Sequence, residues 1–240
     1  MPGTKPQRTR RWERRRNEIL AAAEAVFGER GFEGTRLEDV ADRLEMRRPS
    51  LLYYFADKEA LYDATFEAIL ERFWSRIEAA RDAEDPLERM DAIASAWIEC
   101  LSERPNAARI VLRQIVDVLP SRGEAVQARL GAILDAIREE IDEGVEAGLF
   151  KPVDARMYAT TIAGASMCWV AAQPVVKRSF GIDPLAPESL EEFREMLAHL
   201  TRRMLGTEHD GSSRVAGPEA NARSTPRDPD SRRRARRKRS

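Results

Sequence analysis

The sequence predicts an all-α fold, and three observations support this prediction. Apolar residues recur at helical spacing, three and four positions apart, through most of residues 12–205. Charged residues make up 34% of the chain and hydrophobic residues 42%, a balance that is typical of long amphipathic helices. The 240 residues include only 13 glycines and few runs of β-branched residues, which argues against an all-β fold.

The first segments of the chain predict an arm and two helices. Residues 1–11 are polar and basic with two prolines, so we expect a flexible arm. A helix is expected over residues 12–30, and Gly31 is suited to end it. Thr35 and Glu38 have the spacing of a capping box, which would start a second helix.

Two more helix starts follow closely. A third helix is expected after Met46, because Pro49 fits a first helical turn, where its missing N–H is not needed. Asp57 is suited to cap a fourth helix that runs to about Ala83. A helix followed by two short helices with a tight turn between them is the pattern of a helix-turn-helix unit. We therefore place a first domain over residues 12–60.

Residues 61–205 are predicted to form a second, larger helical domain. Pro86 and Pro105 each mark the start of a helix. A long amphipathic helix is expected over residues 123–150, and a more apolar helix with small residues at its centre over residues 154–173.

The C-terminal part of the chain is predicted to hold a loop, a helix and a tail, and the charge of the chain differs between its N-terminus and its body. A loop is expected over residues 174–187, a final helix over residues 188–205 and a disordered basic tail over residues 206–240. Residues 1–16 hold seven Lys and Arg against one Glu, whereas residues 60–205 hold 17 Lys and Arg against 25 Asp and Glu. A basic head on an acidic body indicates one end that binds a polyanion and one end that does not.

Several classes of function lack their sequence signals. Cys100, Cys168, His199 and His209 show no metal-binding spacing, so neither a metal site nor a cofactor is expected. No Gly-rich phosphate loop and no nucleophile elbow is present, so we do not expect an enzyme. No apolar run reaches the roughly 20 residues of a membrane span and no signal sequence is recognisable, so we expect a cytoplasmic protein with no membrane partner.

The stretch ILAAAEAVFGERGFEGTRLEDVADRLEMRRPSLLYYFADKEAL, from Ile19 to Leu61, resembles the DNA-binding head of the TetR family of bacterial regulators. The resemblance is carried by the Gly-Phe turn after the first helix, by a threonine before a helix with Val-Ala, and by the ending Tyr-Phe-x-x-Lys-Glu-x-Leu. Two positions depart from the family pattern. Glu45-Met46-Arg47 stands where the family often has Gly-Val-Ser, and Leu52 stands where many members have a phosphate-contacting tyrosine.

The resemblance implies a homodimeric, ligand-responsive transcriptional regulator, in most cases a repressor. It would bind a palindromic double-stranded DNA operator and release it when a small-molecule effector binds. An activator and a ligand-free architectural DNA-binding protein are the alternatives. The helical body of residues 61–205 argues against the architectural protein, because DNA binding alone does not need a domain of that size.

The candidate DNA contacts follow from side-chain chemistry and from the resemblance. Arginine suits guanine O6 and N7 or phosphate, whereas hydroxyl groups and helix N-termini hold phosphate without reading sequence. The alternative is that the tyrosines border a small core and the arginines form a solvated face. The candidates are Thr35, Arg36, Arg47, Arg48, Pro49, Ser50, Tyr53, Tyr54 and Lys58.

The body supplies candidates for an effector pocket and for a dimer interface. Pocket candidates combine aromatic walls with a few polar groups, although plain core packing is the alternative for each of them. They are Phe66, Met90, Trp97, Gln114, Met167 and Trp169. The last two predicted helices suit a four-helix interface between two copies of the chain. Its candidates are Gly164, Ala165, Cys168, Leu197, Leu200 and Met204.

Overall fold

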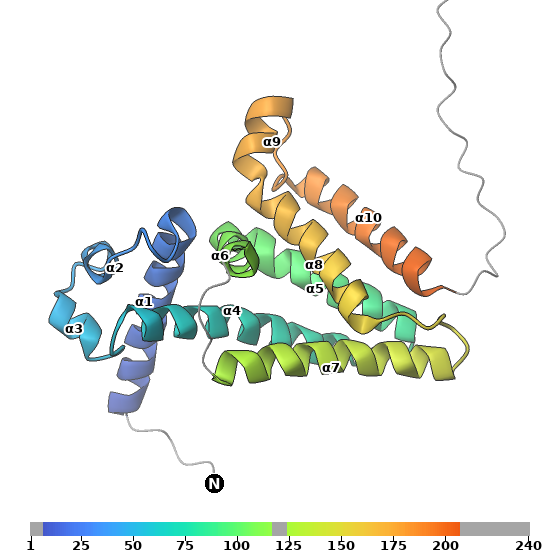
Figure 1. Ribbon diagram of the computed structural model, residues 1–240, viewed down its shortest axis with the longest axis horizontal. Coiled ribbons are helices and arrows are strands. Elements are labelled where there is room, and N and C mark those ends of the chain that lie inside the picture. The colour runs from blue at the N-terminus through green and yellow to red at the C-terminus, as the bar shows by residue number, and fades with distance from the viewer. Residues whose placement is uncertain (1–6, 117–123, 207–240) are drawn as a thin grey trace, which may run out of the picture. The chain divides into compact units, whose positions relative to one another are not determined.

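The computed structural model describes residues 7–116 and 124–206, and these residues fold into ten helices (Figure 1). The all-α fold predicted from the sequence is confirmed. In chain order the helices are α1 (Gln7–Arg30), α2 (Leu37–Arg43), α3 (Arg48–Leu52), α4 (Lys58–Ala80), α5 (Pro86–Glu103), α6 (Pro105–Val116), α7 (Glu124–Glu146), α8 (Ala155–Ala171), α9 (Gln173–Phe180) and α10 (Pro187–Leu205).

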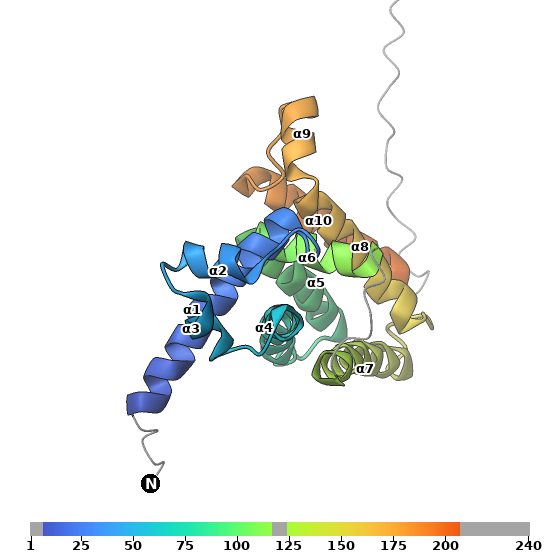
Figure 2. The same ribbon diagram turned by 60° about the vertical axis from the view of Figure 1, so that its left-hand side comes forward.

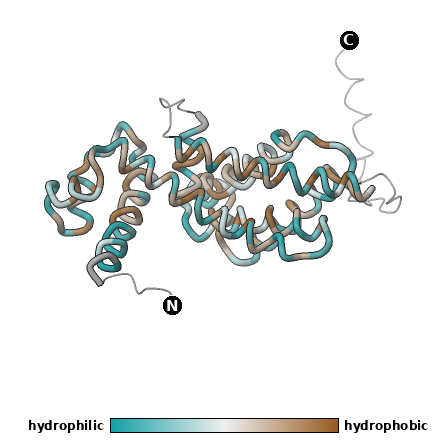
Figure 3. The backbone as a smooth tube through the Cα atoms, turned by 90° about the horizontal axis from the view of Figure 1, so that it is seen from below, coloured by the Kyte–Doolittle hydropathy of each residue, from teal (hydrophilic) through white to brown (hydrophobic). Residues whose placement is uncertain are grey.

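Helices α1, α2 and α3 form the head of the protein. The apolar residues that recur along α1 face α2, α4 and α6, and Ile19, Phe27, Val40 and Leu51 are fully buried. Each such residue contributes about 1.5–3 kcal/mol to stability by leaving water. The tube of α1 accordingly changes from hydrophilic to hydrophobic along its length from the N-terminal end (Figure 3). The core of the head is therefore continuous with that of the remaining helices.

Helix α5 lies at the centre of the body. It packs against α4, α6, α7, α8 and α10, and its own buried residues include Met90, Trp97 and Leu101 (Figure 2). Helix α6 packs against both α8 and α1, and α4 also packs against α1. Two body helices, α4 and α6, are therefore in direct contact with the first helix of the head.

Several helix starts predicted from the sequence are confirmed. Pro86 and Pro105 are the first residues of α5 and α6. Asp57 precedes α4, and its carboxylate accepts a hydrogen bond from the N–H of Ala60 at 2.7 Å. Asp154 precedes α8, and its Oδ1 accepts from the N–H of Arg156 at 2.8 Å. These carboxylates satisfy amide donors that have no partner within their helix.

Two predicted boundaries at the N-terminal side were wrong. Helix α1 begins at Gln7, so the last five residues of the predicted arm belong to the helix. The capping box of α2 lies one residue later than predicted, because Arg36 is the residue before the helix and its N–H donates to Asp39 Oδ2 at 2.8 Å.

The loop predicted over residues 174–187 was also wrong in part. Residues 173–180 form α9, which ends at Gly181 in a left-handed conformation with φ of 70°. Pro174 lies in the first turn of this helix, where proline is tolerated. The tail predicted over residues 206–240 lies outside the described residues except for Gly206.

A buried ionic cluster holds α7 against the junction of α4 and α5. Glu140 of α7 is 3% exposed and accepts hydrogen bonds from Arg81 at 2.8 Å and from Arg89 at 2.5 Å. Arg89 is 6% exposed and also donates to the carbonyl oxygens of Ala83 and Glu84. Since each charged group has charged or carbonyl partners, the cluster keeps α7 in a fixed position beside α4 and α5.

None of the described helices alone is long and apolar enough to cross a membrane. Helices α8 and α9 reach that length and apolar composition only together, and the chain bends by 61° between them.

Candidate nucleic-acid interface and effector cavity

Helix α3 presents a row of exposed side chains. Leu51 is fully buried and fixes the helix to the head, while Arg47, Arg48 and Ser50 are exposed and Tyr53 is 71% exposed. Arg47 is the residue before the helix, and Pro49 lies in its first turn. The N-terminal residues of a helix in the major groove are those that reach base edges, so these exposed residues stay the predicted base contacts.

An aromatic pair joins α1 to the end of α3. The rings of Trp12 and Tyr54 are stacked with 5.7 Å between their centroids, and Tyr53 lies edge-on to Tyr54 at 5.4 Å. The Arg16 guanidinium lies 5.4 Å from the centroid of the Phe55 ring. Sequence reasoning missed Trp12, for which the only signal was an aromatic residue within a strongly basic stretch.

The turn between α2 and α3 contains a strained residue. Glu45 has a φ of 51°, the left-handed region that favours glycine. Its N–H donates to the carbonyl of Asp42 at 3.1 Å, and that of Met46 donates to the carbonyl of Ala41 at 3.0 Å. These hydrogen bonds hold the turn at a cost of roughly 1 kcal/mol for a residue with a side chain.

Four predicted DNA contacts line one shallow groove at the N-terminal end of α4: Thr35, Arg36, Arg48 and Lys58. Arg36 is exposed, and Arg48 forms an exposed ion pair with Glu38 at 3.1 Å. The groove therefore carries three cations and two carboxylates, Glu38 and Asp57, and Asp57 already occupies the N-terminus of α4 as its cap.

Thr35 and Lys58 also have partners inside the head. Thr35 is 2% exposed and its hydroxyl donates to the carbonyl of Gly31 at 2.7 Å, so its side chain faces inward rather than outward as expected. Lys58 Nζ donates to the carbonyl of Phe32 at 3.1 Å and lies 4.2 Å from the centroid of that ring. Both residues shape the loop before α2, and their contact with phosphate stays a prediction.

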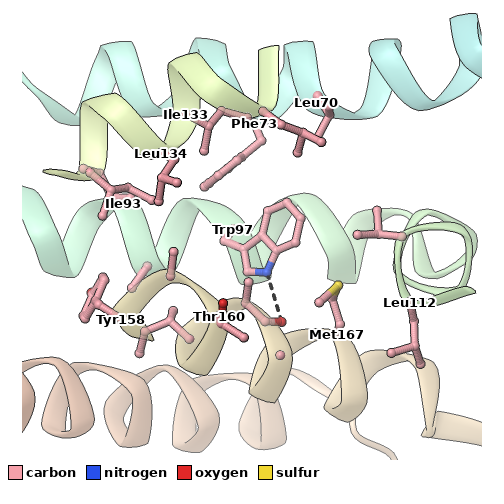
Figure 4. Close-up of a pocket in the computed structure, with 18 residues that line it drawn as sticks. Leu70, Phe73, Ile93, Trp97, Leu112, Ile133, Leu134, Tyr158, Thr160 and Met167 are labelled. Atoms are coloured by element: carbon pink, nitrogen blue, oxygen red, sulfur yellow. Dashed lines mark hydrogen bonds between the residues drawn. The ribbon is translucent and has the colours of Figure 1, made fainter. Parts of the chain in front are cut away.

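The body contains an apolar cavity of about 460 Å³ that is open to the surface at one edge. Side chains from α4, α5, α6, α7 and α8 line it, and Trp97 reaches across it from α5 towards α8 (Figure 4). Its edge lies between α7 and α8, where Leu130 and Thr160 are exposed. The lining residues are Leu70, Phe73, Ile93, Ala94, Trp97, Val111, Leu112, Leu130, Ile133, Leu134, Ile137, Tyr158, Ala159, Thr160, Ile162, Ala163, Gly164 and Met167.

Two of the six predicted pocket residues, Trp97 and Met167, line this cavity. Phe66 and Met90 are buried in the core away from it. Gln114 instead accepts a hydrogen bond from the hydroxyl of Tyr62 at 3.4 Å. Trp169 is also outside the lining. Its ring stacks on that of Phe193 with 5.0 Å between centroids, and its Nε1 donates to the carbonyl of Pro184.

The predicted dimer residues fall into four groups. Cys168 is exposed on α8, whereas Ala165, Leu200 and Met204 are half-buried. Gly164 lines the cavity. Leu197 is 1% exposed within the single chain, so it packs into its own core and is not available to a partner. The exposed apolar residues on these two helices are Met157 of α8, at 72%, and Met196 of α10, at 46%.

A buried carboxylate connects the head to the body. Glu24 of α1 is 5% exposed and lies between Arg104, whose Nε donates to it at 2.9 Å, and Arg72 of α4 at 3.6 Å. Burial raises the pKa of the Glu24 carboxyl, and the two arginines oppose that shift.

Helix α6 is attached to α1 at a second point. Arg113 Nη1 donates to the carbonyls of Phe27 and Gly28 at 3.0 and 3.2 Å. A Cβ on Gly28 would come within 2.4 Å of Asn106 Cβ, so the two helices cross closely at this glycine. Through Val111 and Leu112, α6 also forms part of the cavity wall.

Within residues 7–116 and 124–206 no group of three or more His, Cys, Asp or Glu side chains is placed to hold a metal ion. The fold and these two sites define a helix-turn-helix DNA-binding protein with an internal apolar cavity in its helical body.

Comparison with known proteins agrees with this class. The family described as "Bacterial regulatory proteins, tetR family" matches residues 19–65, and "Tetracyclin repressor-like, C-terminal domain" matches residues 83–172. The HTH-type transcriptional regulator RutR of Escherichia coli K12 is 30% identical over 151 residues, which cover 63% of this chain and 71% of the relative. The chain belongs to the TetR family and is a ligand-responsive, DNA-binding transcriptional regulator. This family consists of regulators rather than enzymes.

Solved structures show the same fold. The ketosteroid transcriptional regulator KstR2 of Mycobacterium tuberculosis superimposes with a TM-score of 0.62 at 24% identity, over 81% of this chain and 96% of that one. AibR, solved in complex with isovaleryl coenzyme A and operator DNA, gives a TM-score of 0.63 at 21% identity, over 78% of this chain and 97% of that one.

Proposed function

We propose that this regulator is a cytoplasmic repressor that binds a palindromic operator as a homodimer and leaves it when a small molecule enters the cavity. The observation that supports this proposal is that three consecutive residues of α6 contact both the cavity and the first helix of the head. Val111 and Leu112 line the cavity, and Arg113 donates to the carbonyls of Phe27 and Gly28 at the end of α1. A displacement of α6 by a ligand would therefore act directly on the head.

The mechanism is a difference in affinity between two conformations of the body. If the ligand binds better to a conformation in which α6 has moved, it lowers DNA affinity by the same factor by which DNA lowers ligand affinity. In a dimer that movement changes the separation of the two α3 helices, which must match successive major grooves about 34 Å apart. The exposed Met157, Cys168 and Met196 on α8 and α10 offer a surface for the second copy.

Direct base reading is assigned to Arg47, Arg48 and Ser50, with Pro49 setting the start of α3. Phosphate contact is assigned to Arg36, Tyr53, Tyr54 and Lys58, and to Thr35 through its loop. The exposure of the α3 side chains and the shared groove at the α4 N-terminus support this division. Arg48 must give up its ion pair with Glu38 to reach DNA. The free-energy cost is small, because the two side chains are 56% and 50% exposed.

The test is selection of bound duplexes from sheared genomic DNA of the source organism, with purified protein at about 150 mM salt, where nonspecific binding is weak. The expected result is an enriched palindrome whose half-sites are spaced for a dimer. Transcription of the adjacent genes in a deletion strain then tests the sign, and higher expression is expected for a repressor. Enrichment of single half-sites would contradict the dimer, and lower expression would identify an activator.

A further inference from the structure

The cavity wall contains very few polar groups. Of its described lining residues none is charged, and only Trp97, Tyr158 and Thr160 carry a side-chain nitrogen or oxygen. A ligand that enters loses its water, and every polar atom that finds no partner then costs about 1–3 kcal/mol. An ionised group costs several times more unless a charge of opposite sign is present. The described part of the wall therefore disfavours a charged group that lies inside the cavity.

Two of the three polar groups do not need a ligand, because one has a hydrogen-bond partner and the other can reach water. Tyr158 is 1% exposed, and its hydroxyl is hydrogen-bonded to Thr201 Oγ1 at 3.0 Å, on the side of α10. This burial raises the pKa of Tyr158 to about 12, so the hydroxyl stays neutral. Thr160 is exposed at the edge of the cavity, where water can reach it.

The third group, the indole N–H of Trp97, is held weakly. Trp97 is 6% exposed, its ring lies edge-on to that of Phe73 at 4.6 Å, and its Nε1 donates to the carbonyl of Ala163 at 3.4 Å (Figure 4). That distance is longer than the usual 2.7–3.2 Å, and a carbonyl inside α8 is a helix acceptor already. A ligand oxygen at normal distance would give this donor a better partner.

We propose that the effector is an uncharged, largely apolar molecule with one acceptor oxygen, such as a ketone or an ester, and that Trp97 Nε1 is the donor that selects it. The volume of about 460 Å³ has room for about 15 non-hydrogen atoms, judged from the share of about 30 Å³ that a water molecule occupies. The inference rests on the proposed function, in which this cavity is the effector site.

The test compares matched probes on the full-length protein by isothermal titration calorimetry. The probes are 2-undecanone, undecane and undecanoate, which share a chain length and differ in the oxygen and the charge. The ketone is expected to bind about fivefold to tenfold more tightly than the hydrocarbon, the value of one hydrogen bond. Undecanoate is expected to bind most weakly. In Trp97→Phe the preference for the ketone over the hydrocarbon should disappear while hydrocarbon binding stays.

A control variant and a spectroscopic measurement make the result specific. Leu134→Ala changes the wall from α7 and leaves Trp97 and its neighbour Phe73 in place, so it should weaken all probes alike and keep the preference for the ketone. The infrared carbonyl stretch of bound 2-undecanone should lie at lower frequency in the native protein than in Trp97→Phe. Tightest binding of undecanoate, binding of none of the probes, or a ketone preference that survives Trp97→Phe in a folded protein would overturn the proposal.

The same probes separate this inference from the proposed function. If 2-undecanone binds with the expected dependence on Trp97 but leaves operator binding unchanged, the ligand class stands and the cavity is not the site that controls DNA binding. If operator binding is lost on addition of undecanoate alone, the control of DNA binding stands and the ligand class is wrong.

Discussion

Glu24 and Arg104 form an ion pair across the junction of head and body, with 2.9 Å between Glu24 Oε1 and Arg104 Nε. The carboxylate is almost fully buried and belongs to α1, whereas the arginine lies between α5 and α6. Since the body helices that contact α1 are also in contact with the cavity wall, the position of the head depends on such polar links as well as on apolar packing.

Replacing Arg104 with Ala should destabilise the protein strongly. The change leaves Glu24 buried with only the longer contact to Arg72, and loss of one partner of a buried ion pair costs about 3–5 kcal/mol. We expect about 2–3 kcal/mol from urea unfolding, because Arg104 itself is partly exposed. Arg14→Ala is the control, since its partner Glu18 is an exposed neighbour on the same helix. Equal effects of the two changes would contradict the role given to Glu24.

Gly28→Ala should destabilise the crossing of α1 and α6, although alanine is normally the better helix residue. The added Cβ would lie 2.4 Å from Asn106 Cβ, and overpacking of this kind costs about 1–3 kcal/mol. Gly131→Ala in α7 is the matched control, because its Cβ meets nothing within 4 Å and should stabilise by about 0.5–1 kcal/mol. The two melting temperatures should therefore move in opposite directions.

Glu45→Gly should stabilise the turn between α2 and α3. A glycine adopts the φ of 51° without strain, and the gain is about 0.5–1 kcal/mol after the larger entropy of its unfolded state is counted. Glu45→Asn should give a smaller gain, since asparagine tolerates this conformation. Thermal unfolding in the absence of DNA measures both, and a loss of stability in both variants would show that the turn is not strained.

Arg47→Ala should weaken binding to the selected operator and relax one base position. A bidentate arginine contact to guanine is worth about 1–3 kcal/mol, which corresponds to a fivefold to hundredfold loss of affinity. Arg43→Ala is the control, because Arg43 is an exposed arginine of α2 that is paired with Glu29. Fluorescence anisotropy gives the affinity, and a repeated selection gives the base preference. Unchanged affinity and an unchanged selected sequence in Arg47→Ala would exclude this contact.

Asp154→Ala should lower stability near neutral pH, and this effect should shrink as the pH falls from about 4 towards 2. The hydrogen bond from Arg156 and those from the amides at the start of α8 lower the pKa of Asp154 to about 2. Because the folded-state pKa is lower than the usual value of 3.8, the contribution to stability is present above that value and is lost as the pH falls towards 2. The difference in melting temperature from the native protein should shrink over this range.

Arg156→Ala serves as the partner variant for that measurement. It removes the side-chain hydrogen bond from Arg156, which is the largest cause of the low pKa, and keeps the backbone amides that Asp154 caps. Its pH dependence should therefore lie between those of the native protein and of Asp154→Ala. A difference that stays constant from pH 7 to pH 2 would show that Asp154 does not titrate as described.

The fold was predictable wherever a local signal marks a helix end. Pro86, Pro105 and Asp57 act within one turn of the chain, so their positions could be read directly. The start of α2 was misplaced by one residue because Thr35-Glu38 and Arg36-Asp39 have the same spacing, and only tertiary packing, which buries the Thr35 side chain, decides between them. Helix α9 was missed because its proline and terminal glycine are also the residues of a loop.

The sites were predictable to different degrees for a related reason. Contacts of a recognition helix come from consecutive residues, so the exposed row on α3 could be read from one short stretch. A cavity arises where five helices fail to fill the space between them, and helical spacing shows only which face of each helix is buried. Trp97 and Met167 were therefore identified as large buried residues, whereas the wall contributed by Ile133 and Ile137 gave no separate signal.

The two cysteines differ in a way that is useful for spectroscopy. Cys168 is exposed on α8, whereas Cys100 is buried on α5, and burial raises the pKa of the Cys100 thiol. Since the thiolate is the reactive form and the sequence has no third cysteine, the native chain carries one readily labelled thiol. Because Cys168 also lies on the surface proposed for the second copy, the proposed dimer would cover this thiol. The rate at which a fluorescent maleimide labels it over a range of protein concentrations would then report formation of the dimer in a chain with its natural sequence.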